Sequence, residues 1–199
     1  QGKHMSNLED IVKEIATIEP VQKRLDALLA ERTRLRNEQF AAATPAEKRV
    51  TLAQDVIMQL NAEMITAEQG TYLSLHDENS LKCDACALGS LFICAVSKPA
   101  LALEIDELVD MDDRESMHDH LEGIFERTQL DMIETAFEMD SFMDLDCEAG
   151  SAEEFEEAEA NHEALVNRVI EFGTRFDDDK ARLIAIMENI VANKGTFVP

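Results

Sequence analysis

Two cysteines separated by two residues, Cys83-Asp84-Ala85-Cys86, form the clearest chemical motif in this chain. A tight turn of this kind brings two thiolates within reach of one tetrahedral zinc ion. The ligands that could complete a zinc site are Cys94, Cys147 and His76, but a second C-x-x-C or C-x-x-H pair is missing. We therefore favour small-residue packing in a buried helix. Redox use of the pair is disfavoured because a redox C-x-x-C normally follows a strand in a βαβ unit, and nothing in the sequence supports such a sheet.

A second candidate is the dipeptide His118-Asp119, with His76 upstream and Asp177–Asp179 downstream. This order is similar to the ligand order of HD-type metal phosphohydrolases, which are helical enzymes. A metal-dependent hydrolase using His76, His118 and Asp119 therefore remains an alternative. The pair lies in a strongly acidic run, where the ring is expected to meet carboxylates that raise its pKa.

Other catalytic and cofactor-binding patterns fail. Asp144-x-Asp146-x-Glu148 begins like a calcium loop, but Ala149 replaces the required glycine and Phe155 replaces the bidentate glutamate. The sequence contains no phosphate-binding G-x-x-x-x-G-K-[ST], no G-x-G-x-x-G and no G-x-S-x-G. We expect a non-catalytic protein without a cofactor. The alternative is a protein that binds zinc.

Charge is the outstanding global feature. The 199 residues include 18 Lys and Arg against 42 Asp and Glu, a net charge of −24. The segment Glu104–Glu163 holds 23 of the acidic residues and only Arg114 and Arg127 as basic ones. Such a surface repels phosphates, which disfavours nucleic acids and anionic membranes as direct ligands.

Closely spaced carboxylates steer basic partners toward a protein. The acidic segment therefore predicts an interaction protein that binds a basic, nucleic-acid-binding surface of another protein as a DNA or RNA mimic. The alternative is a solvated face that maintains solubility. The expected contact residues are Asp110, Asp112, Asp113, Asp119, Asp140, Asp144, Asp146, Glu153, Glu154, Glu156 and Glu157.

The elements that position these residues are expected to be helices. Residues 1–5 have the character of an expression-tag remnant. Residues 6–43 are predicted to form a neutral helical hairpin or short coiled coil, broken at Pro20, with apolar residues seven apart at Val21, Leu28 and Leu35. Because this stripe needs a cover, the hairpin is a candidate oligomerisation arm.

Residues 44–199 are predicted to form an acidic multi-helix bundle, which makes the chain all-α. Thr44-Pro45-Ala46-Glu47 is a helix start, and that helix should stop near Gly70. The stretch Tyr72–Leu75 is the only strand candidate. Further helices are expected at Cys83–Val96, Leu101–Val109, Arg114–Phe125 and Gln129–Phe142, from Ser151 to Gly173, and through Leu183–Val191. With no transmembrane or signal segment, we expect a cytoplasmic protein.

Several segments resemble a group of small helical bacterial and phage proteins with a Cys-Ala-Leu-Gly helix and a Gly-x-Phe-x-Pro tail. The matching segments span roughly residues 50–199 and include Cys86-Ala-Leu-Gly89 and Gly195-Thr-Phe-Val-Pro199. The resemblance implies a small helical accessory protein that is encoded by a phage and acts inside a bacterial host cell. In that setting we expect an inhibitor of a host enzyme or defence factor. The resemblance assigns no catalytic residue to this chain.

Overall fold

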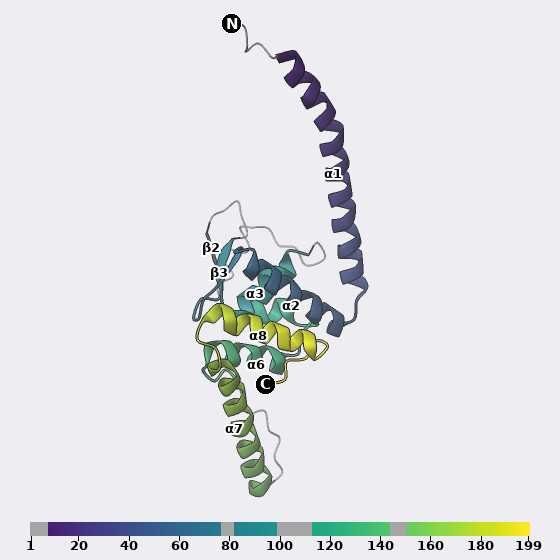
Figure 1. Ribbon diagram of the computed structural model, residues 1–199. Coiled ribbons are helices and arrows are strands. Elements are labelled where there is room, and N and C mark those ends of the chain that lie inside the picture. Colours follow the sequence, from purple (N-terminus) through teal and green to yellow (C-terminus); the bar gives the residue numbers. More distant parts are fainter. Residues whose placement is uncertain (1–7, 77–81, 99–112, 144–150) are drawn as a thin grey trace. The chain divides into compact units, whose positions relative to one another are not determined.

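The computed structural model describes residues 8–76, 82–98, 113–143 and 151–199 (Figure 1). The chain divides into two compact units, Gln1–Ala42 and Ala43–Pro199. The described part is mostly helical, with seven helices and a small three-stranded sheet. The expected helical architecture is therefore confirmed in its broad form, and the sheet is the part that an all-α chain would lack. Among the described helices, none combines the length and apolar character needed to cross a bilayer.

The first unit contains one long helix, α1 (Leu8–Ala42). It continues through Pro20, so the break that the predicted hairpin required is not there. A proline inside a helix costs about 3 kcal/mol. Good helix formers (Leu, Ala, Arg, Glu and Gln) continue from Val21 to Ala42 and offset that cost. Leu28 is 61% exposed, and Val21 and Leu35 are exposed as well.

The second unit begins with the helix start that the sequence predicts. In α2 (Pro45–Asn61), the Thr44 amide donates to Glu47 Oε2 over 2.8 Å, and the Glu47 amide donates back to Thr44 Oγ1. This capping box confirms the predicted start. The helix ends well before Gly70, because Glu63 adopts a left-handed φ of 57° and a strand follows.

Three short strands make the sheet: β1 (Ile65–Ala67), β2 (Ser74–Leu75) and β3 (Cys83–Ala85). The order is β1-β3-β2, with β3 parallel to β1 and antiparallel to β2. The predicted strand is thus confirmed in part by β2. The helix expected from Cys83 was placed too early, because Cys83–Ala85 pairs with strands on both sides. A short apolar run fits a buried strand and a buried helix equally well.

Helix α3 (Ala87–Val96) lies at the centre of this unit, and all ten of its residues are buried. It packs against α2, α6 (Arg127–Glu138) and α5 (Arg114–Leu121). Gly89 lets the chain before β2 come close, since a Cβ there would lie 1.6 Å from the Tyr72 carbonyl oxygen.

Helices α5 and α6 end earlier than predicted. Gly123, with φ 82°, follows α5, and Met139, with φ 57°, ends α6. Glu122 leaves the helical conformation directly before Gly123, and Met139 is itself left-handed, so each helix stops while apolar spacing continues beyond it. The helix expected at Leu101–Val109 lies outside the described residues.

The last two helices are α7 (Ala152–Thr174) and α8 (Asp179–Ala192). Ser151 caps α7 by accepting the Glu154 amide over 3.2 Å, which confirms the predicted start. Figure 1 shows α8 beside α6, and α8 also packs against α2. The C-terminal tail folds back so that Phe197 is buried, and its amide donates to Gln129 Oε1 over 2.8 Å.

Candidate functional site

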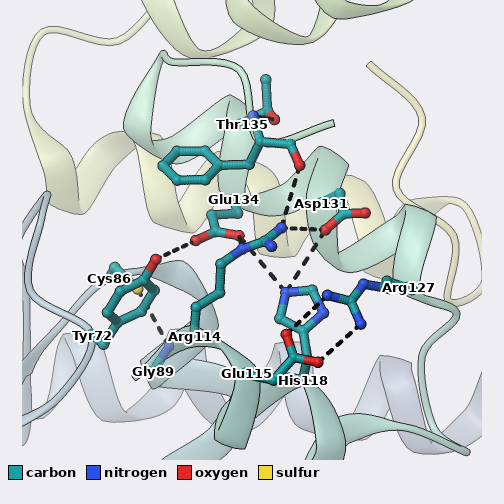
Figure 2. Close-up of polar contacts among 11 residues, drawn as sticks. Tyr72, Cys86, Gly89, Arg114, Glu115, His118, Arg127, Asp131, Glu134 and Thr135 are labelled. Carbon is teal, nitrogen blue, oxygen red and sulfur yellow. Dashed lines mark hydrogen bonds and ion pairs between the residues drawn. The ribbon is translucent and has the colours of Figure 1, made fainter. Parts of the chain in front are cut away.

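A buried polar cluster joins α5, α6 and the chain before β2 (Figure 2). The Arg114 Nε donates to Glu134 Oε2 over 2.7 Å, and its Nη2 donates to Asp131 Oδ1 over 2.5 Å. The Tyr72 hydroxyl donates to the other Glu134 oxygen over 2.9 Å. Arg114 and His118 are four residues apart on α5, so they share the face that meets α6.

His118 lies beneath this network, is 3% exposed and has no hydrogen-bond partner on either ring nitrogen. Its Nε2 lies 3.8 Å from Asp131 Oδ1 and 3.8 Å from Glu134 Oε2. Both distances exceed those of direct hydrogen bonds. Buried polar atoms are nearly always hydrogen-bonded, so a buried imidazole that meets two carboxylates only at ion-pair distance requires an explanation.

The surroundings shift the pKa values of Glu134, Asp131 and Tyr72 in different directions. Burial acts to raise the pKa of Glu134, but neighbouring His118 and Arg114 outweigh it and hold that pKa below its usual value. Burial also raises the pKa of Asp131, with Arg114 opposing the shift only in part. Burial and the charge on Glu134 raise the pKa of Tyr72, which therefore remains a hydrogen-bond donor at neutral pH.

The residues of the predicted metal sites are not assembled in the way the sequence suggested. His76 Nε2 lies 2.8 Å from Asp84 Oδ1, and Asp119 is exposed. Among the described residues, the one group of metal-ligand types with atoms all within 4.8 Å of one another is His118, Asp131 and Glu134. Neither the set Cys83, Cys86, Cys94 and His76 nor the set His76, His118 and Asp119 forms such a group, and Cys147 lies outside the described residues.

The cysteine motif does stand between a strand and a helix, contrary to the sequence expectation. Cys83 begins β3 and Cys86 caps α3, where its Sγ accepts the Gly89 amide over 3.5 Å. Burial raises the pKa of Cys83 to about 11 and the pKa values of Cys86 and Cys94 to about 12. Because the thiolate is the reactive form, this environment disfavours nucleophilic or redox use at neutral pH.

The predicted acidic contact set is divided. Asp113 caps α5 by accepting the Ser116 amide over 2.9 Å, and Asp140 accepts the Ser141 amide over 2.8 Å. Asp119 is exposed on α5. Four members lie exposed together on α7: Glu153, Glu154, Glu156 and Glu157. Asp110, Asp112, Asp144 and Asp146 lie outside the described residues.

No protein family, curated protein or solved structure was found to match this chain. The assignment of function therefore rests on the chain's own geometry. Sequence reasoning missed Arg114, Asp131 and Glu134. A signal for them existed in two spacings, Arg114 to His118 and Asp131 to Glu134, each of which places two polar side chains on one helical face.

Proposed function

We propose that this chain is a non-catalytic interaction protein whose α7 binds a basic surface of another protein. The observation that carries the proposal is the exposure of residues 152–167, none of which is buried. This stretch holds six glutamates and no lysine or arginine: Glu153, Glu154, Glu156, Glu157, Glu159 and Glu163.

The weak internal stabilisation of residues 152–167 supports the existence of a binding partner. No residue of 152–167 is fully buried, and only Ala158, His162, Leu165 and Val166 are half-buried, whereas tertiary packing supplies most helical stability in proteins. Glu153 and Glu157 are four residues apart, as are Glu159 and Glu163, and like charges at this spacing destabilise a helix. A basic surface would relieve this repulsion on binding.

An exposed aromatic ring distinguishes this face from one that only maintains solubility. Phe155 lies among the glutamates of α7 and is 45% exposed. Aromatic rings are enriched at protein interfaces, where they supply buried apolar area inside a polar rim. A solvated acidic face needs no such ring.

The partner chemistry follows from the charge. A net charge of −24 favours rapid association with the most basic proteins of a cell, which bind nucleic acids. The proposed role is therefore inhibition of a host nuclease, polymerase or defence factor, with glutamates taking the place of phosphates. A phage accessory protein acting in the bacterial cytoplasm fits this role.

A second contact is proposed for α1. Val21, Leu28 and Leu35 are exposed at heptad spacing on a 35-residue helix. A second copy of α1 would cover this stripe in a short coiled coil. The first unit would then hold two copies together while each α7 engages a partner.

Capture from a bacterial lysate at low salt, followed by identification of the retained protein, tests the main proposal. The variant Glu153→Gln, Glu154→Gln, Glu156→Gln and Glu157→Gln removes four charges from α7. A matched control changes four exposed glutamates elsewhere: Glu63→Gln, Glu68→Gln, Glu122→Gln and Glu126→Gln.

The proposal predicts that the α7 variant binds the purified partner at least about tenfold more weakly, while the control stays near the original affinity. Added duplex nucleic acid should displace the original protein. Equal weakening by both variants would show that only total charge matters and would contradict the assignment to α7.

A further inference from the structure

The buried imidazole of His118, which makes no hydrogen bond, points to a function that the acidic surface does not explain. We propose that His118 Nε2, Asp131 and Glu134 bind one divalent transition-metal ion, which links α5 to α6. This site differs from the cysteine and HD-type sites that the sequence suggested, and it stands independently of the function proposed for α7.

The distances favour a metal ion over a direct hydrogen bond or a bridging water, and an ion pair with a protonated imidazole would leave both ring nitrogens without a hydrogen bond. His118 Nε2 lies 3.8 Å from each carboxylate oxygen, beyond a direct hydrogen bond of about 3.2 Å or less. A water molecule that bridged the groups at ordinary angles would separate them by about 4.6 Å. Two ligands of a tetrahedral ion at about 2.1 Å lie about 3.4 Å apart, so a contraction of about 0.4 Å would complete the site.

The donor set selects the class of ion. One imidazole nitrogen and two carboxylates suit zinc and neighbouring transition metals, and three protein ligands leave a fourth position for water. Magnesium prefers oxygen ligands in octahedral geometry and keeps much of its hydration. We therefore assign the site to an ion of the zinc type.

Arg114 contacts the same two carboxylate oxygens that face His118. A carboxylate oxygen has two lone pairs and can accept a guanidinium bond and bind a metal ion together. Outer hydrogen bonds of this kind orient metal ligands. The arginine charge also opposes a cation, because two carboxylates and one guanidinium leave the site with a net charge of only −1.

A route for the ion lies beside His118. A cavity of about 20 Å³ is bounded by His118, Asp119, Glu122, Phe125, Arg127 and Leu130. Asp119, Glu122 and Arg127 are exposed there, so two carboxylates and one guanidinium line the cavity. The two negative charges outweigh the single positive charge, which favours the approach of a cation.

Calorimetric titration of the full chain with ZnCl2, and separately with MgCl2, tests the proposal. One zinc ion should bind per chain and raise the Tm, whereas magnesium should not. His118→Ala should abolish this zinc-dependent shift, and Asp131→Asn should weaken binding by at least about tenfold. The control is His120→Ala, two residues further along α5, where Nδ1 lies 2.8 Å from the Ser116 carbonyl oxygen.

Cobalt substitution of the unaltered protein gives a second measurement that does not depend on how a variant folds. Ligation by nitrogen and oxygen predicts visible d–d bands of four-coordinate Co²⁺ without a thiolate charge-transfer band. A thiolate band would place the ion at Cys83 or Cys86 and overturn the proposal. Absence of zinc binding, or unchanged zinc binding in both His118→Ala and Asp131→Asn, would overturn it as well.

Discussion

Arg114 joins α5 to α6 through Glu134, whose carboxylate is 1% exposed and accepts the arginine Nε–H over 2.7 Å. Removing one partner of a buried ion pair leaves the other charge unpaired. The substitution Arg114→Met should therefore lower the free energy of unfolding by about 3 kcal/mol in urea titrations.

Arg127→Met is the matched control, because Arg127 pairs with Glu115 at the surface, where both side chains are more than half exposed. Exposed pairs contribute little to stability. If the two variants shift the urea midpoint equally, Arg114 is not a buried structural link between the helices.

Gly89 should tolerate no side chain, because its missing Cβ makes room for the Tyr72 carbonyl oxygen. Gly89→Ala is expected to destabilise the fold by about 3 kcal/mol, since backbone cannot yield as a flexible side chain does. Gly70→Ala, with φ 73° and open space around it, should cost only about 1 kcal/mol of left-handed strain. Thermal unfolding compares the two, and a milder effect at Gly89 would contradict this close approach.

The thiols of the C-x-x-C motif should be unreactive at neutral pH. Burial raises the pKa of Cys83 to about 11, and an unfolded cysteine titrates near about 8.5. In a Cys147→Ser background, a chromogenic aromatic disulfide should therefore react with the folded protein about 100-fold more slowly at pH 8 than with the unfolded chain. Rapid reaction of the folded protein would show that a thiol is accessible and ionised.

The raised pKa of Cys83 also determines whether the stability of the fold rises or falls at alkaline pH. The Cys83 thiol has a pKa of about 8.5 in the unfolded chain and about 11 in the folded protein. Between these two values, folded Cys83 keeps a proton that the unfolded residue has lost. The contribution of Cys83 to stability is therefore complete below this window and is lost as pH rises through it.

The self-association proposed for α1 predicts a change in mass on truncation. The full chain should be oligomeric in light scattering, and residues 43–199 should be monomeric and folded. Replacing Val21, Leu28 and Leu35 by serine should have the same effect, because it removes the apolar seam. An oligomer that survives both changes would exclude α1 as the contact.

Helix starts were the most predictable feature of this chain. Thr44 and Ser151 were identified because a cap depends on residues three positions apart, which local sequence contains. The continuity of α1 through Pro20 was not predicted, because a local pattern identifies the unfavourable proline but not the summed helix propensity of the long segment around it. The pairing of Cys83–Ala85 was missed because it depends on β1 and β2, which lie elsewhere in the sequence.

The buried cluster was only partly predictable. His118 stood out as a candidate ligand, but its sequence neighbour Asp119 is exposed. Its actual neighbours, Asp131 and Glu134, lie on another helix among 42 acidic residues, and only the side-chain contacts between α5 and α6 distinguish them. Long-range packing, which local patterns do not encode, decided the composition of this site.

The salt dependence of binding measures whether charge drives the proposed contact between α7 and a basic partner. The affinity of the captured partner should fall steeply between about 50 mM and about 300 mM salt, because screening shortens the reach of exposed charges. The variant with four α7 glutamines should show a clearly shallower slope than the control with four glutamines elsewhere. An affinity that does not change with salt, or equal slopes for the two variants, would exclude a charge-driven contact through α7.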